Sequence, residues 1–317
     1  MSWKGKRIFI TGAGGFIGSH LAKRLLDEGA QVHILARKGG SLWRIKDRVD
    51  RLVMWDADIN DCTTLRTNLC NADPQIVFHL AAQVDVSRSW DLVGPMLNNN
   101  LMGTINLLSA LRECRLESFI YTGSSEEYGT SPSPLGEDQR EDPLSPYSFS
   151  KLASSYFCQM AAKIFDLPVT IVRLFPVYGP FQEGSMFIPS AIRELLLKKD
   201  FAMSPGDQKR EFNYIDDIVE AFLRIALCRD AHGEVFNVGN GIPFRVKDVI
   251  DIIQRLAWGD STINIGALPY RKGEGMECFC NNQKLKSLTG WSPKVSLEEG
   301  LRMTIEWYKS YYDKVKE

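Results

Sequence analysis

The stretch RIFITGAGGFIGSHL, residues 7–21, decides the fold of this 317-residue chain. RIFIT is an apolar run typical of a buried strand, and a helix is expected to begin at FIGSHL. The turn between them carries Gly12, Gly15 and Gly18, which allow the backbone to approach a pyrophosphate closely. The N–H groups and the dipole at the start of the helix favour such an anion. We interpret the stretch as a dinucleotide-binding turn; the alternative is a tight turn without a ligand.

Strands and helices continue to alternate after this turn. The first-half strands are expected at residues 7–11, 31–36, 51–58, 75–82, 118–123 and 168–175. The intervening helices are expected at residues 16–27, 61–69, 97–112 and 147–165, with Asp61 as a helix cap. This order predicts a parallel sheet with right-handed crossovers, a Rossmann-like doubly wound α/β fold.

The pattern loosens after residue 175, where Pro176, Gly179 and Pro180 mark loops. Later elements are expected at residues 188–199, 215–228, 246–256 and 297–311 (helices) and 234–239 (a strand). We therefore expect residues 1–175 to form a dinucleotide-binding domain. Residues 176–317 are expected to form a smaller substrate-binding lobe, with part of 212–245 returning to the first domain.

Charge and cysteine content argue against several classes of protein. Lys and Arg number 38 against 39 Asp and Glu, which gives no reason to expect nucleic acid or an anionic membrane as a partner. The start MSWKGKRIFITG lacks the apolar stretch of a signal peptide, and no apolar run is long enough to span a bilayer. The seven cysteines include no CxxC pair. We expect reduced thiols, no metal site and a cytoplasmic location.

Tyr147 and Lys151, in SPYSFSK, are the strongest candidates for chemistry. Residues four apart share a helix face, so the two side chains can reach one point. A free phenol has a pKa near about 10, and a nearby ammonium would lower that pKa. The pair therefore predicts a proton-transfer device at a carbonyl or alcohol. The alternative is an ordinary amphipathic helix with a core tyrosine and a solvated lysine.

The loop GSSEEYG, residues 123–129, follows the fifth expected strand, at the sheet edge where parallel folds bind ligands. Ser124 is positioned to hydrogen-bond a substrate oxygen together with Tyr147. Glu126 is a candidate second acid or base. The alternatives are a serine that stabilises the turn and a solvated glutamate.

The end of the second strand predicts which cofactor binds. In this fold an acidic residue there binds the ribose of NAD, whereas an arginine accommodates the 2′-phosphate of NADP. The chain has Arg37 and Lys38 and no acid at this point. We therefore favour NADP(H), with NAD(H) possible; the alternative is that both are loop charges. Asp58 is a candidate adenine contact or a helix cap.

Taken together, these motifs resemble the extended short-chain dehydrogenase/reductases that act on nucleotide-sugars. The similarity runs along the whole chain: TGAGGFIG, HLAA (79–82), NNLMGT (99–104), SSEEYG, SPYSFSK, RLFPVYGP (173–180), KREFNYIDDIVEA (209–221), NVGNG (237–241) and LPYRKGE (268–274). The resemblance implies that Tyr147 is the acid/base, that Lys151 holds the nicotinamide ribose, and that Ser124 binds the reacting sugar oxygen. It also implies a homodimer formed through helices 97–112 and 147–165.

The resemblance assigns the remaining site residues by position. The implied cofactor contacts are Gly12, Gly15, Phe16, Ile17, Gly18, Arg37, Asp58, Ile59, Leu80, Ala81 and Ala82. The implied substrate contacts are Asn100, Ser125, Arg210 and Arg271, of which the two arginines would hold the nucleotide diphosphate. Pro176 departs from the family pattern, since many relatives have asparagine there.

Within the family, GSSEEYG and HLAAQVDVSRSW are most similar to GDP-4-keto-6-deoxymannose reductases. We therefore expect NADPH-dependent reduction at C4 of a 4-keto nucleotide-sugar. The alternatives are a 4-epimerase and a 4,6-dehydratase, for which Glu126 would remove the C5 proton. A protein that senses NADP(H) without chemistry is a further alternative, which the presence of Ser124, Tyr147 and Lys151 disfavours.

Overall fold

A computed structural model describes residues 2–257, 261–271 and 273–316. In this part of the chain the main sheet is parallel and seven-stranded, in the order β11-β6-β5-β4-β1-β2-β3. Its strands are β1 (Arg7–Thr11), β2 (Gln31–Ala36), β3 (Val53–Asp56), β4 (Ile76–His79), β5 (Ser118–Ser124), β6 (Val169–Leu174) and β11 (Val235–Val238). The predicted doubly wound α/β fold is confirmed.

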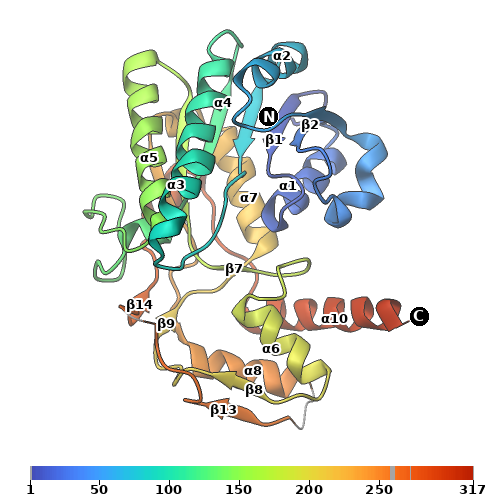
Figure 1. The fold of residues 1–317 in the computed structure, drawn as a ribbon, viewed down its shortest axis with the longest axis vertical. Coiled ribbons are helices and arrows are strands. Elements are labelled where there is room, and N and C mark those ends of the chain that lie inside the picture. The colour runs from blue at the N-terminus through green and yellow to red at the C-terminus, as the bar shows by residue number, and fades with distance from the viewer. Residues whose placement is uncertain (1, 258–260, 272, 317) are drawn as a thin grey trace.

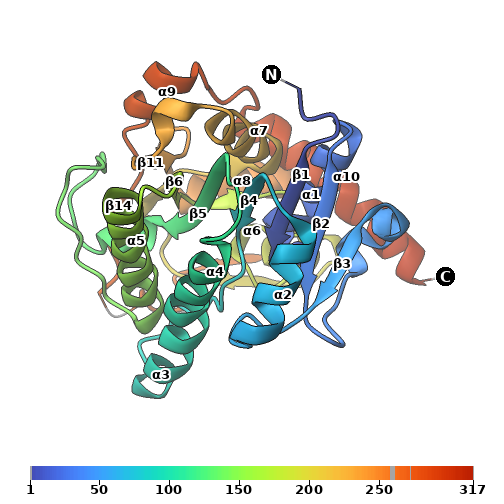
Figure 2. The same ribbon diagram turned by 90° about the horizontal axis from the view of Figure 1, so that it is seen from above.

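Helices cover both faces of the sheet (Figure 2). One face carries α2 (Cys62–Ala72), the continuous helical run α3 (Val93–Met96), η3 (Leu97–Met102) and α4 (Gly103–Leu111), and α5 (Pro146–Phe165). The other face carries α1 (Phe16–Asp27) and α7 (Ile215–Ala226). As predicted, Asp61 caps α2, because its carboxylate accepts the N–H of Thr64 at 3.1 Å.

Alternating side chains of the strands build two apolar layers. In β1, Ile8 and Ile10 pack into the layer that contains Phe222 of α7, while Phe9 packs into the layer that contains Leu107 of α4. All five side chains are buried. The same strand thus anchors helices on both faces and fixes the glycine-rich turn that follows Thr11.

The second lobe lies below the carboxyl edge of the sheet in Figure 1. Its helices are α6 (Phe187–Leu196), α8 (Val246–Ala257) and α10 (Leu297–Lys316), whereas α9 (Gln283–Thr289) packs beside β11 of the main sheet. Its short strands are β7 (Val177–Tyr178), β8 (Phe201–Met203), β9 (Lys209–Arg210), β10 (Asn213–Tyr214), β12 (Phe244–Arg245), β13 (Ile263–Ile265) and β14 (Glu277–Cys278). Between these elements the chain returns to the first domain, where α7 packs on α1 and β11 pairs with β6.

Several predicted boundaries differ from the structure. The strands expected at 51–58 and 75–82 are shorter, and the helix expected from residue 97 begins at Val93 and includes a π-helical turn. A 3₁₀ helix, η1 (Trp43–Arg51), has no counterpart in the prediction. Its sequence WRIKDRVDR is mostly charged and buries only Ile45, so it carries little apolar periodicity. No helix in the described ranges is both long and apolar enough to cross a bilayer.

Candidate active site

The glycine-rich turn forms a cradle that only glycine can line. Gly12 has a φ of +78°, and a Cβ there would lie 2.7 Å from the backbone nitrogen of Ala81. Gly15 is the N-cap of α1 and offers no side-chain acceptor, so the first N–H groups of the helix face outward without a cap. A Cβ on Gly18 would collide with the carbonyl oxygen of Gly12. These residues fit a dinucleotide pyrophosphate.

The other predicted cofactor residues surround this cradle. Phe16 and Ile17 are the first residues of α1, and the Leu80–Ala82 segment continues directly from β4. The backbone N–H of Ala81 donates to Oγ1 of Thr11 at 3.2 Å, which fixes this segment beside Gly12. The structure thus brings the ends of β1 and β4 together, as the predicted cofactor site requires.

Two predicted adenosine contacts lie farther along the sheet edge. Arg37 follows β2 in an exposed loop. Asp58 and Ile59 follow β3; one carboxylate oxygen of Asp58 accepts the N–H of Asn60 at 2.8 Å. Asp58 therefore stabilises its own turn, whereas the helix cap is Asp61. Ile59 packs so closely on Gly103 that a Cβ there would lie 2.9 Å from it.

The three predicted catalytic residues converge at the end of β5. Ser124 is the last residue of β5, and Tyr147 and Lys151 lie on the first turns of α5, which Ser145 caps and Pro146 begins. All three are buried, with exposed fractions of 7%, 8% and 3%. The Ser124 hydroxyl lies close enough to the Tyr147 phenol to lower its pKa. This arrangement can present a phenol and a hydroxyl to one oxygen of a ligand.

The predicted lowering of the Tyr147 pKa by Lys151 is not seen in this structure. Burial raises the pKa of Tyr147 to about 12, and the neighbouring Ser124 hydroxyl only partly opposes that rise. Burial likewise lowers the pKa of Lys151 to about 8. Lys151 does not lower the Tyr147 pKa because its ammonium is directed to the carbonyl oxygen of Thr122, to which it donates a hydrogen bond. The position of Tyr147 in the first turn of α5 still favours a phenolate, through the helix dipole.

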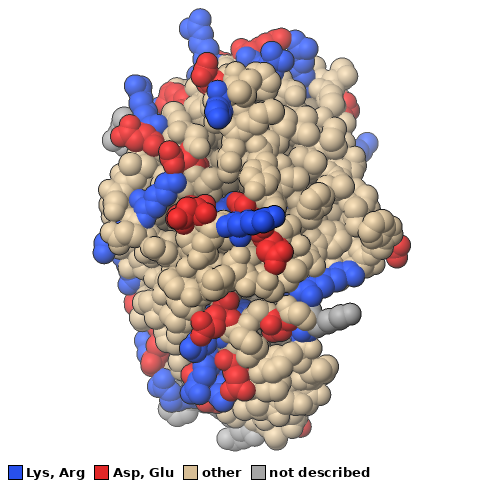
Figure 3. Space-filling model, turned by 90° about the vertical axis from the view of Figure 1, so that its left-hand side faces the viewer, with Lys and Arg blue, Asp and Glu red and all other residues tan. Residues whose placement is uncertain are grey.

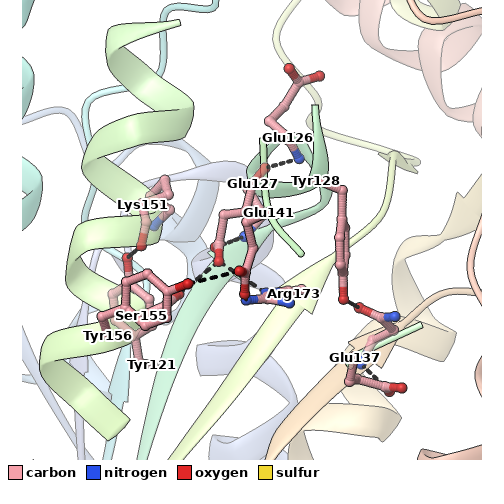
Figure 4. Close-up of polar contacts among 12 residues, drawn as sticks. Tyr121, Glu126, Glu127, Tyr128, Glu137, Glu141, Lys151, Ser155, Tyr156 and Arg173 are labelled. Carbon is pink, nitrogen blue, oxygen red and sulfur yellow. Dashed lines mark hydrogen bonds and ion pairs between the residues drawn. The ribbon is translucent and has the colours of Figure 1, made fainter. Parts of the chain in front are cut away.

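Neighbouring glutamates in GSSEEYG have opposite environments, and Figure 4 shows them pointing apart. Glu126 opens onto a pocket, whose walls limit the hydration of its carboxylate and raise its pKa, although Arg210 and Arg271 oppose that rise. Glu127 is fully buried beneath the loop. The sequence singled out Glu126 and missed Glu127, although two adjacent acids after a buried strand were a visible signal.

The pocket beside this loop has a volume of about 390 Å³ and lies between the two lobes. Four predicted residues line it, namely Ser125, Glu126, Arg210 and Arg271, together with Pro176. The prediction missed three further charged residues that line it, Arg88, Glu274 and Glu277.

Contacts within the pocket wall show how its charges are held. Nη2 of Arg88 donates to the carbonyl oxygen of Gly273 at 3.1 Å and links the two lobes. Arg210 forms an ion pair with Glu274 and donates to the carbonyl oxygen of Gly275 at 2.6 Å. The pocket therefore offers three guanidinium groups, one of them already paired with a carboxylate.

Asn100, a predicted substrate contact, lies away from this pocket. It is 2% exposed, its Oδ1 accepts the N–H of Gln83 at 2.8 Å, and its Nδ2 donates to Oγ of Ser150 at 2.9 Å. The side chain thus fastens the segment after β4 to α5. The structure assigns Asn100 to support of the site, since its polar atoms are already occupied.

Comparison with known proteins identifies the family. The family model described as GDP-mannose 4,6 dehydratase matches residues 9–304. The chain belongs to this family. Its relatives are enzymes of the extended short-chain dehydrogenase/reductase group, as the motifs indicated, and the chain is accordingly a nucleotide-sugar-modifying enzyme.

Two curated relatives and one solved structure illustrate the range of this family. A UDP-glucose 4-epimerase of Mycolicibacterium smegmatis is 31% identical, over 96% of this chain and 99% of the relative. A dTDP-D-glucose 4,6-dehydratase of Homo sapiens is 31% identical, over 97% and 91%. The structure of a UDP-glucuronic acid 4-epimerase from Bacillus cereus, in complex with UDP-glucuronic acid and NAD, is 32% identical with a TM-score of 0.86, over 96% of this chain and 99% of that chain.

Proposed function

We propose that this enzyme is a nucleotide-sugar 4-epimerase. The observation that carries the proposal is the buried Ser124–Tyr147 pair, which adjoins a pocket lined by guanidinium groups. The named relatives above are 4-epimerases and a 4,6-dehydratase, and both reactions begin by oxidising C4. The 4-keto reductase predicted from the sequence gains no support from these relatives.

In the proposed reaction, Tyr147 accepts the proton of the C4 hydroxyl and later returns a proton to the C4 oxygen. Ser124 holds that oxygen in place, since its hydroxyl already faces the phenol. Bound NAD or NADP would supply the chemistry by accepting a hydride from C4 and giving it back. The burial of Ser124 and Tyr147 keeps bulk water away from the oxygen on which they act.

Arg210 and Arg271 are proposed to hold the diphosphate, because guanidinium groups bind phosphate oxygens in a bidentate manner. Both line the pocket from the second lobe, whereas Ser124 and Tyr147 belong to the sheet domain. A substrate anchored by its diphosphate could rotate its sugar so that either face of C4 would meet the bound cofactor, while the C4 oxygen stays beside the phenol. Inversion at C4 requires this freedom.

Glu126 favours a second candidate, the 4,6-dehydratase. Its carboxylate opens onto the pocket and its raised pKa suits a group that takes a proton from carbon. Two of the three named relatives are 4-epimerases. We therefore rank elimination below epimerisation.

The cofactor preference remains a prediction. The solved relative above contains NAD, whereas Arg37 in the exposed loop after β2 suits the 2′-phosphate of NADP. We propose that the chain accepts both dinucleotides and binds NADP(H) more tightly.

We also propose a homodimer built on η3 and α5. Large apolar side chains are exposed there: Met102, Phe149, Met160 and Ile164 are 42%, 49%, 39% and 62% accessible. Figure 3, which views the molecule from the side where α5 lies, shows a broad area with few charges. An Ile164→Glu variant should be monomeric by light scattering, while the control Ile265→Glu in the second lobe should keep the wild-type mass.

The experiment that tests the proposed reaction is product analysis. The enzyme is incubated in deuterated water with UDP-, dTDP-, GDP- and CDP-hexoses, and products are identified by NMR and mass. Epimerisation gives a C4 epimer without deuterium at C5 and without net cofactor consumption. A 4-keto-6-deoxy product with deuterium at C5 would replace the proposal by the dehydratase. Consumption of one NADPH per turnover of a 4-keto sugar would replace it by the reductase.

A further inference from the structure

Glu127 lies at the centre of a buried polar network (Figure 4). Its Oε1 accepts the backbone N–H of Ser124 at 2.8 Å. Its Oε2 accepts Oγ–H of Ser155 at 2.9 Å and Nε–H of Arg173 at 2.9 Å. Glu127 is 0% exposed and Arg173 is 1% exposed. Three donors from β5, α5 and β6 therefore converge on one carboxylate.

This set of contacts suits a carboxylate and does not suit an amide. Both oxygens of a carboxylate accept hydrogen bonds, and all three neighbours of Glu127 are donors. A glutamine at this position would have to turn its NH₂ group toward either Ser124 N–H or the Arg173 guanidinium. One of those donors would lose its acceptor, which is costly in a buried site.

The network continues away from the site through Arg173. Its Nη2 pairs with Glu141, and Glu141 accepts the phenol O–H of Tyr156 at 2.8 Å. The Arg173 guanidinium also lies 4.7 Å from the ring centroid of Tyr128. Residues of β6, the loop before α5, and α5 itself thus hold Glu127 from several sides. This network involves more residues than are needed to stabilise the loop after β5 alone.

The network fixes the position of Ser124. Its N–H is held by Glu127, and its Oγ accepts the N–H of Glu126 at 3.2 Å, which leaves the hydroxyl hydrogen to be directed elsewhere. Together these contacts fix the N-cap of η4 (Ser125–Tyr128) and the side chain that faces Tyr147. A misplacement of about 1 Å at such a position can cost about 100-fold in rate.

We infer that Glu127 is a positioning residue that sets Ser124 against the reacting oxygen, with Arg173 and Glu141 holding its carboxylate in place. This inference rests on the proposed chemistry at C4, but it does not depend on whether the product is an epimer or a 4-keto sugar. A purely structural role for Glu127 would affect stability and leave the placement of Ser124 unchanged in the folded protein.

The charge of Glu127 gives the role a measurable signature. Burial is the main cause of the high Tyr147 pKa, and the negative charges of Glu126 and Glu127 raise it further. The same carboxylate raises the pKa of Lys151 against the effect of burial. The other titratable or charged groups around Glu127 are Tyr121, Tyr156, Cys158 and Arg173, together with Glu141, which shares Arg173 with it. Removing the charge should lower the Tyr147 pKa.

The main test compares Glu127→Gln with the matched control Glu137→Gln. Glu137 also accepts a backbone N–H, that of Asn237 at 2.8 Å, but it has no contact with Ser124. Glu127→Gln should lower kcat about 10- to 100-fold with KM changed less than about twofold. The limb of the pH profile that rises with deprotonation of Tyr147 should move to lower pH. Glu137→Gln should change neither kcat nor the profile.

Two further measurements decide the inference if folding or turnover fails. Crystal structures of the wild-type and Glu127→Gln proteins should be compared. In the variant, Ser124 Oγ should lie farther from Tyr147 than in the wild type, and this measurement needs no substrate. If Glu127→Gln does not fold, the triple variant Glu127→Leu, Arg173→Met and Glu141→Gln removes the three charges of the network together, which buried ionic groups often tolerate. It should fold, with kcat lowered as in Glu127→Gln.

The outcomes separate this inference from the proposed function. If the wild-type enzyme turns over none of the nucleotide-sugars, the proposed function is overturned. The position of Ser124 in the two crystal structures still decides the inference. An unmoved Ser124, or a Glu127→Gln enzyme with wild-type kcat and an unshifted profile, overturns the inference. Equal losses in the Glu127 and Glu137 variants also overturn it, because the effect would then be general.

Discussion

The two sides of the active site are built in different ways. The Ser124, Tyr147 and Lys151 side is buried and comes from β5 and α5 of the main sheet domain. The Arg210 and Arg271 side comes from short strands and loops of the second lobe and is accessible to solvent. We therefore propose that proton transfer depends on the buried part of the main sheet domain. Selection of the nucleotide-sugar is left to segments that can vary without disturbing it.

The largest expected effect lies on the buried side. Tyr147→Phe should lower turnover about 10²- to 10⁴-fold, the usual contribution of a positioned acid/base, with KM and cofactor affinity nearly unchanged. The control Tyr270→Phe removes a phenol from the second lobe, where its oxygen accepts the N–H of Asp207. Steady-state kinetics on both variants measure the contrast. Near wild-type turnover in Tyr147→Phe would remove that residue from the chemistry.

Arg37 tests the outer end of the cofactor site. Losing a charged hydrogen bond should weaken NADP(H) by about 1.5–3 kcal/mol in Arg37→Ala, because only NADP carries the 2′-phosphate. NAD(H) affinity should stay close to that of the wild type. Calorimetric titration of both cofactors measures the difference, with Arg66→Ala, an exposed partner of Glu113, as control. Equal weakening of both cofactors would reject the assignment.

Substitutions on the accessible side should change KM instead of kcat. Arg271→Ala should raise KM for the sugar nucleotide about tenfold, because the diphosphate is held alike in the ground and transition states. Arg210→Ala should raise it more, since the variant also leaves Glu274 unpaired beside the diphosphate. The control is Arg245→Ala, which breaks an exposed pair with Asp248 outside the pocket lining. A lowered kcat at constant KM would place these arginines on the chemical side.

Glu126 lies where the two sides meet, and its effect should be the smallest. Under epimerisation no step needs a second acid or base, so Glu126→Gln should lower kcat less than about tenfold. The measurement is the kcat of the Glu126→Gln variant on the nucleotide-sugar that the product analysis identifies as a substrate. Complete loss of elimination, with hydride exchange retained, would instead identify a dehydratase.

The sequence predicted the buried side well because local signals define it. RIFIT, the glycine turn and the spacing of Tyr147 and Lys151 each depend on neighbours along the chain. The pocket side depends on contacts between distant segments. Arg88 reaches Gly273 across 185 positions, and no periodicity indicates such a contact.

For two site residues, packing reveals physical features that the sequence did not indicate. The side-chain amide of Asn100 already forms hydrogen bonds with Gln83 and Ser150 in the interior. Its place in NNLMGT did not indicate these contacts. The Tyr147 pKa rises because desolvation outweighs a lysine that points at Thr122. Sequence spacing showed which residues share a face, but it did not give their hydration or direction.

The most direct test of the central claim follows the hydrogen on C4. UDP-glucose or UDP-glucuronate carrying deuterium at C4 is converted by the enzyme, and the product is analysed by NMR and mass. The account predicts a C4-epimeric product that keeps its deuterium at C4, with no accumulation of reduced cofactor. Deuterium found in released cofactor, or at C6 of a 4-keto-6-deoxy sugar, would contradict it.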